Sequence, residues 1–127
     1  MNIVKTTLTL VAWSVLFVAS LSAQVTDTSL SASIDLLWGV KIPMRDGIQL
    51  NATVYKPKGA GPLPVILTLT PYIADTYHNE AFYFAQNGYV FVMVDVRGRG
   101  NSQGTFNALR QEANDGFDAV GWIARQS

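Results

Sequence analysis

The residues in this sequence that most suggest chemistry are a serine flanked by glycines. Gly100 to Gly104 reads G-x-S-x-G, the pattern around the nucleophile of many serine hydrolases, with Ser102 at its centre. In those enzymes the serine stands on a sharp turn directly between a strand and a helix. Here the apolar, strand-like run ends at Asp95, and helical periodicity resumes only near Gln111. Ser102 is therefore predicted to lie in the middle of a loop, where its hydroxyl would bond to backbone groups.

The sequence also offers no suitable base for this serine. Activation needs a histidine that is itself oriented by a carboxylate. The single histidine, His78, precedes Ser102, whereas the order in one large class of these enzymes is serine, acid, histidine. We predict that Ser102 is not a nucleophile and that His78 is a surface residue near the start of a helix. The alternative, a minimal esterase that uses Ser102, predicts that a fluorophosphonate probe labels this serine.

Composition and motifs exclude several other classes of function. Nine basic and nine acidic side chains cancel, and no basic patch indicates a nucleic-acid partner. Gly98, Gly100 and Gly104 are spaced one residue too widely for a dinucleotide-binding fingerprint, and no G-K-[ST] follows them. No His, Cys, Asp or Glu cluster has the spacing of metal ligands. We expect neither a cofactor nor a metal.

The first 23 residues have the pattern of an export signal. Lys5 supplies a positive charge, Leu8 to Leu21 is an apolar stretch, and residues 22–24 (Ser-Ala-Gln) could form a cleavage region. The stretch is shorter than the ~20 residues of a membrane-spanning helix, so we expect cleavage rather than an uncleaved anchor. Without cysteine the exported chain would depend on its core for stability. We predict a bacterial periplasmic or secreted protein that is not stably inserted in a membrane.

The rest of the chain alternates strand-like and helix-like segments. Residues 24–35 are polar and are predicted to be a linker, and residues 36–127 a single domain. The predicted elements are a hairpin of 36–43 and 48–55, a strand 65–70 buried on both faces, a helix 79–87, a strand 89–95 and a helix 111–126. This order predicts an α/β fold with a largely parallel sheet and helices on both faces. The last strand would have an unpaired apolar edge, so we expect a fragment of a larger domain.

The two predicted helices are amphipathic. In the first, Phe82, Phe84 and Ala85 are expected to lie inward, and Asn87-Gly88 to end the helix. In the second, one apolar face is predicted from the spacing of Ala113, Phe117, Val120 and Ala124. Asp115 and Asp118 lie off that face, and we interpret them as solvated residues or loop anchors rather than as a catalytic carboxylate pair.

Four segments together resemble the N-terminal part of the X-prolyl dipeptidyl peptidase and cocaine esterase family of α/β-hydrolases. Each alone is a weak signal, but their order and spacing are specific. They are I-P-M-R-D-G-I-Q-L-N-A-T-V-Y-K-P (42–57), T-P-Y (70–72), Q-N-G-Y-V-F-V-M-V-D-V-R-G-R-G-N-S-Q-G-T-F (86–106) and E-A-N-D-G-F-D-A-V-G-W-I-A (112–124). The resemblance implies hydrolysis of a small ester or a short X-Pro-type peptide through an acyl-serine intermediate.

The resemblance also implies roles for particular residues. Tyr72 of T-P-Y would donate its hydroxyl to the oxyanion hole, the alternative being a tyrosine that closes the strand end and packs on a helix. The catalytic serine, aspartate and histidine would lie beyond Ser127, so this chain alone would be inactive. Asp95 and Arg97 would order the loop after their strand, with a substrate-facing role as the alternative. A non-catalytic binding module built from the same half-domain remains the other functional hypothesis.

Overall fold

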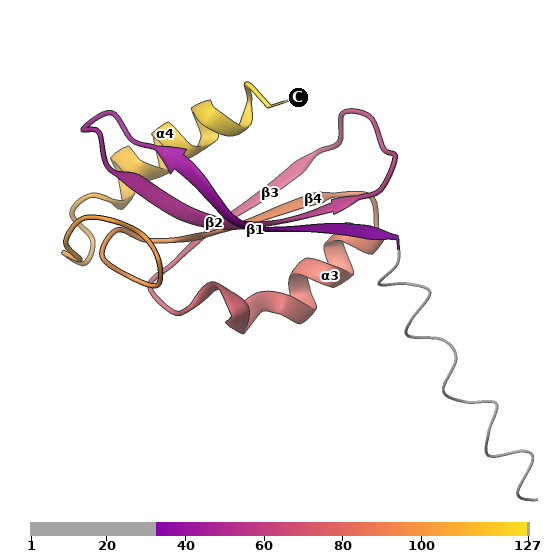
Figure 1. Ribbon diagram of the computed structural model, residues 1–127, viewed down its shortest axis with the longest axis horizontal. Coiled ribbons are helices and arrows are strands. Elements are labelled where there is room, and N and C mark those ends of the chain that lie inside the picture. The colour runs from indigo at the N-terminus through magenta and orange to yellow at the C-terminus, as the bar shows by residue number, and fades with distance from the viewer. Residues whose placement is uncertain (1–32, 127) are drawn as a thin grey trace, which may run out of the picture. The chain divides into compact units, whose positions relative to one another are not determined.

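Four strands form one sheet with a helix on each face. The computed structural model describes residues 33–126. Its elements are β1 (Ile34–Pro43), β2 (Gln49–Pro57), β3 (Val65–Thr70), the 3-10 helix η1 (Ala74–Tyr77), α3 (His78–Gln86), β4 (Val90–Asp95) and α4 (Glu112–Ile123). In Figure 1, α3 and α4 lie on opposite sides of the sheet, which confirms the predicted α/β arrangement. The predicted signal peptide, residues 1–23, lies outside the described residues, and so does most of the predicted linker.

The predicted hairpin is confirmed. β1 and β2 pair antiparallel, with Ile34 opposite Pro57 and Pro43 opposite Gln49. Gly47 turns the chain between them with a φ of +86°, a conformation that glycine adopts without steric cost. The hairpin therefore forms where the sequence places turn residues between two strand-like runs.

The order of the strands corrects three expectations. The sheet runs β1-β2-β4-β3, and among these strands only β3 and β4 are parallel, so the described sheet is mixed rather than largely parallel. β3, expected to be buried on both faces, lies at the edge of the described sheet, and most of its side chains are only half-buried. The last strand, β4, has no unpaired edge because it inserts between β2 and β3 and pairs with both; the outer strands of the described sheet are β1 and β3.

Each face of the sheet has its own hydrophobic core. The side chains of β4 alternate between the two, with Val92 and Val94 in one cluster and Phe91 and Met93 in the other. The first cluster includes Ala119 of α4; the second includes two alanines of α3, Ala81 and Ala85. These small helix residues allow close approach of each helix to the sheet, and the strands supply most of the apolar volume.

Helix α4 packs on the sheet with a different side from the one predicted. Phe117 and Val120 are 73% and 56% exposed, whereas Asp115 and Ala119 are buried. The expectation that Ala113, Phe117, Val120 and Ala124 form the packed face is wrong, because the helix is oriented by a buried ion pair of Asp115 that periodicity does not reveal. In α3 the expectation holds: Ala85 is buried, Phe82 and Phe84 are half-buried, and Gly88 follows the helix with a φ of +84°.

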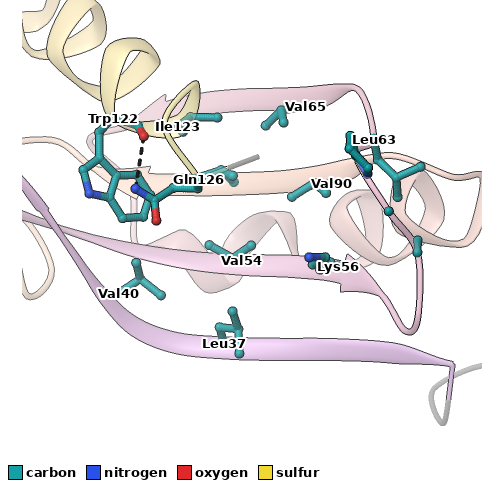
Figure 2. Close-up of a pocket in the computed structure, with 14 residues that line it drawn as sticks. Leu37, Val40, Val54, Lys56, Leu63, Val65, Val90, Trp122, Ile123 and Gln126 are labelled. Atoms are coloured by element: carbon teal, nitrogen blue, oxygen red, sulfur yellow. Dashed lines mark hydrogen bonds between the residues drawn. The ribbon is translucent and has the colours of Figure 1, made fainter.

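An apolar hollow of about 500 Å³ lies beside α4 (Figure 2). Val65 and Val90, the first residues of β3 and β4, line it together with Ile123 from the end of α4. The hollow is therefore at the amino ends of the two parallel strands. The residues that could do chemistry follow the opposite, carboxyl ends, so the hollow is separate from the candidate site.

Candidate active site

Tyr72 stands at the edge of the sheet where sites form in α/β proteins. It follows Thr70, the last residue of β3, which pairs in register with Asp95, the last residue of β4. The carboxyl ends of parallel strands open onto such sites because the loops that follow them converge there. Pro71 has no N–H to continue the ladder and ends the strand. Tyr72 is 68% exposed at this edge.

The backbone around Tyr72 is fixed on both sides. The N–H of Tyr72 donates to Oγ1 of Thr70 at 3.1 Å, and the N–H of Ala74 donates to Oδ1 of Asp95 at 3.1 Å. Thr70 and Asp95 are themselves buried, with 2% and 3% of their surfaces exposed. The exposed phenol is thus carried on a segment that two buried side chains hold in place.

Asp95 binds three separate segments through one carboxylate. Besides Ala74, it accepts a hydrogen bond from Nδ2 of Asn51 on β2 at 3.3 Å and a longer one of 3.5 Å from the N–H of Asn101. A side chain at position 100 would collide with this carboxylate, and Gly100 has a φ of +51°. The structure shows that Asp95 orders its loop, as predicted from the sequence.

Ser102 lies in the loop and uses its hydroxyl for structure. Its Oγ donates to the backbone carbonyl of Asp95 at 2.6 Å and accepts from the N–H of Asn51 at 2.7 Å. The nearest helix along the chain begins ten residues later, at Glu112, so the predicted mid-loop position is confirmed. No imidazole bonds to Ser102 within residues 33–126, and this geometry agrees with the prediction that Ser102 is not a nucleophile.

His78 is occupied elsewhere. It is the exposed first residue of α3, as predicted, and its Nδ1 lies 2.6 Å from the hydroxyl of the buried Tyr55. Its ring also lies against Phe82, with centroids 4.8 Å apart. The histidine thus joins the start of α3 to β2.

Arg97 joins the loop after β4 to two further segments through an ion-pair network. Its guanidinium makes two bonds with Asp115 of α4, at 2.9 and 2.6 Å, and one with Asp46 of the hairpin turn, at 2.6 Å. The side chains of Arg97 and Asp115 are 10% and 3% exposed. The hydrogen bonds that it donates to Asp115, and then to Asp46, raise the pKa of Arg97 above its usual range. Arg97 thus joins the loop after β4 to α4 and to the hairpin turn, as expected for a residue that orders the loop.

A second ion pair runs beside the first. Arg45 donates from its backbone N–H, Nε and Nη2 to the carboxylate of Asp118, at distances of 2.8 to 3.1 Å. These bonds hold the pKa of Asp118 below its usual value, as Arg97 does for Asp46. Asp115 binds Arg97, and Asp118 binds Arg45. Both aspartates therefore anchor loops, which was one of the two interpretations of the sequence.

Sequence reasoning missed Asn51 and Thr70. Both are polar residues inside strands, and both are buried, at 6% and 2% exposure. Their signal was a hydrogen-bonding side chain at a strand position whose neighbours are apolar. Such residues need partners when buried, and here the partners are Asp95 and the backbone of Tyr72.

Neither a metal cluster nor a membrane-spanning helix is found in the described part of the chain. No group of three or more His, Cys, Asp or Glu side chains there could hold a metal ion. None of the helices between residues 33 and 126 has both the length and the apolar character needed to cross a membrane.

The fold matches those of solved hydrolases. The structure of an α-amino acid ester hydrolase superposes with a TM-score of 0.66 at 26% identity, covering 83% of this chain and 22% of that one. An aminopeptidase from a marine sediment Thaumarchaeota archaeon gives a TM-score of 0.63 at 26% identity, covering 73% and 19%. The described residues thus form part of an α/β-hydrolase fold.

The sequence comparisons identify the family. Residues 46–127 match the X-Pro dipeptidyl-peptidase (S15) family. The cocaine esterase of Rhodococcus sp. (strain MB1 Bresler) is 34% identical over 94 residues, which cover 69% of this chain and 16% of the esterase. The chain belongs to the X-Pro dipeptidyl-peptidase (S15) family. It spans about a sixth of the curated relative that it matches.

Proposed function

We propose that the protein carrying this chain is an exported serine hydrolase. It would cleave small esters or short X-Pro-type peptides through an acyl-serine intermediate, with the Tyr72 hydroxyl as a donor to the oxyanion. The observation that carries the proposal is the position of Tyr72. Its exposed phenol stands at the carboxyl end of β3 on a backbone held by Thr70 and Asp95.

The chemistry requires a donor of this kind. The serine oxygen attacks the carbonyl carbon and its proton passes to a histidine, while the carbonyl oxygen acquires the negative charge. A phenol O–H that is already in position stabilises that charge without reorganising during the reaction. The intermediate then collapses, the leaving group takes the proton, and water releases the acyl group by the same route.

We place the nucleophile, its acid and its histidine outside these 127 residues. The hydroxyl of Ser102 already donates to one backbone carbonyl and accepts from one backbone N–H. The region that matches this chain is only 16% of the cocaine esterase. The outer edge of β3 has no strand partner among residues 33–126. The end of α4 lies near the start of β3, so a strand after α4 could run parallel to β3 and arrive beside Tyr72. On this proposal, the 127-residue chain alone is inactive.

Both substrate classes fit the names of the relatives, which include a cocaine esterase, an amino acid ester hydrolase and an aminopeptidase. Esters and amides share the acyl-serine route and differ in the leaving group. Export rests on the signal-like pattern of residues 1–23, and we propose a periplasmic or secreted location.

The test is Tyr72→Phe in the protein that carries this chain. Hydrolysis of a p-nitrophenyl ester and of an X-Pro p-nitroanilide would be measured. Loss of an oxyanion donor should lower kcat by about 100- to 1000-fold with little change in KM. Tyr83→Phe is the matched control, since Tyr83 is a similarly exposed tyrosine on α3. Equal kcat values for the two variants would contradict the role of Tyr72.

A binding module without catalysis is the second candidate. It is favoured by the exposed apolar side chains of Phe117 and Val120 on α4, which could mark a contact surface. It predicts that the chain from residue 24 onward is soluble by itself and melts cooperatively. An aggregated or non-cooperative product would count against it.

A further inference from the structure

The Asp95 carboxylate is placed to control where Tyr72 stands. It accepts from β2 through Asn51, from the loop after β4 through Asn101, and from the first residue of η1, Ala74. Ala74 is two residues from Tyr72. One side chain therefore links the segment of the proposed oxyanion donor to the sheet and to the glycine-rich loop.

The bond to Ala74 fixes the start of η1. The first N–H groups of a helix have no partner within it, so an acceptor at that point determines where the helix begins. Asp95 supplies this acceptor from a site that is 3% exposed. Hydrogen bonds to an ionised carboxylate are roughly twice as strong as those between neutral groups. The segment between Thr70 and Ala74 is thus held at one end by the sheet and at the other by Asp95.

The Asp95 carboxylate makes no ion pair with a Lys or Arg side chain among the described residues, so its oxygens can accept hydrogen bonds from the backbone and from Asn51. Arg97, two residues along, makes its ion pairs with Asp115 and Asp46 instead. Within residues 33–126, the hydrogen-bond donors to the Asp95 carboxylate are N–H groups of neutral residues.

The G-x-S-x-G sequence has a part in this arrangement. Gly100 allows the loop to close against the Asp95 carboxylate, where any side chain would collide. Ser102 holds the backbone carbonyl of the same aspartate at 2.6 Å. The loop therefore contacts Asp95 at two places: Gly100 packs against its carboxylate, and Ser102 binds its backbone carbonyl.

We propose that Asp95 is a positioning residue for catalysis: its carboxylate fixes the Tyr72 segment so that the phenol meets the oxyanion. This inference rests on the proposed function of Tyr72. It assigns Asp95 no contact with substrate and no proton transfer. Its contribution is geometric, and a misplacement of about 1 Å can lower a rate by about 100-fold.

The test is a double-mutant cycle in the protein that carries this chain. Asp95→Asn keeps the shape of the side chain but replaces one acceptor oxygen with a donor, so it should lower kcat by about 10- to 100-fold and leave KM within about twofold. In the Tyr72→Phe background the same change should lower kcat by less than about threefold, because the donor it positions is already absent. A purely structural role would lower activity by the same factor in both backgrounds, and that result would overturn the proposal.

Asp118→Asn is the matched control. It removes a carboxylate whose hydrogen-bond partner among residues 33–126 is Arg45 of the hairpin turn, and it should not change kcat in either background. If Asp95→Asn does not fold, Gly100→Ala provides the test, because its methyl group must displace the carboxylate without removing it. The same non-additivity with Tyr72→Phe is expected, and additivity would again overturn the proposal.

The outcomes separate the two proposals. If Tyr72→Phe leaves kcat unchanged, the oxyanion role fails and the inference about Asp95 fails with it. If Tyr72→Phe lowers kcat but the effect of Asp95→Asn is independent of it, only the inference about Asp95 is overturned.

Discussion

The hydroxyl of Ser102 donates a 2.6 Å hydrogen bond to the backbone carbonyl of Asp95. The same oxygen accepts from the N–H of Asn51 at 2.7 Å, so the serine joins the loop after β4 to β2. The G-x-S-x-G sequence resembles the motif around a catalytic serine, but here its serine holds a loop against the end of β4. The difference depends on context, since a nucleophile must stand between a strand and a helix with its hydroxyl exposed.

The first prediction follows from this pair. Ser102→Ala leaves the backbone N–H of the buried Asn51 without its partner, and should lower the free energy of unfolding by about 1–3 kcal/mol. Chemical denaturation of the protein carrying this chain would measure it. A variant of unchanged stability that can no longer be labelled by a fluorophosphonate would show that Ser102 is the nucleophile after all.

The second prediction concerns the buried ion pair of Arg97 and Asp115. Arg97→Met leaves the Asp115 carboxylate buried without its cation, and should destabilise the fold by about 3–5 kcal/mol. Arg45→Met removes the more exposed pair with Asp118 and should cost less, because solvent screens it. Denaturation midpoints of both variants would be compared. A larger loss for Arg45→Met would contradict the assignment of Arg97 as the main anchor.

The third prediction is a dependence of stability on acid. Hydrogen bonds from Arg45 hold the pKa of Asp118 below its usual value of about 4, so the folded state binds this proton less readily than the unfolded state. The resulting stability is fully present above about pH 4 and is lost as the pH falls through the lowered pKa. Asp118→Asn should flatten this part of the curve, as urea unfolding between about pH 2 and pH 5 would show. Identical slopes for the two proteins would refute the prediction.

The fourth prediction compares two glycines. Gly98 has a φ of +70°, and a methyl group there would lie 2.9 Å from the carbonyl carbon of Thr105 and closer still to the N of Phe106. Gly98→Ala should therefore destabilise by more than about 1 kcal/mol. Gly116 lies inside α4 with open space around it, so Gly116→Ala should stabilise by about 0.5–1 kcal/mol. Thermal melts would check both signs, and a stabilised Gly98→Ala would be inconsistent with the loop described.

The elements themselves could be predicted from the sequence. Each strand is a local run of apolar or alternating residues, and Gly47 and Gly88 mark the hairpin turn and the end of α3 with positive φ angles. Such features depend on neighbours along the chain, which a single sequence displays. The family resemblance, carried by the order and spacing of four segments between residues 42 and 124, could also be found in the sequence and is confirmed.

Features that depend on contacts between distant residues could not be predicted. The position of β4 between β2 and β3 is a property of strand pairing. The buried side of α4 contains Asp115, which pairs with Arg97, 18 residues away along the chain. Because of this ion pair, a charged residue of the helix faces inward. For the same reason sequence reasoning found Asp95 but missed Asn51, 44 residues before it, as its partner.

We propose that this chain carries the oxyanion donor, and not the nucleophile, of a serine hydrolase. The most direct test of this proposal is to label the protein that carries this chain with a fluorophosphonate and to map the modified residue by peptide mass spectrometry. We predict a single adduct on a serine outside these 127 residues, formed more slowly in Tyr72→Phe. An adduct on Ser102, or no adduct on any serine, would contradict the account.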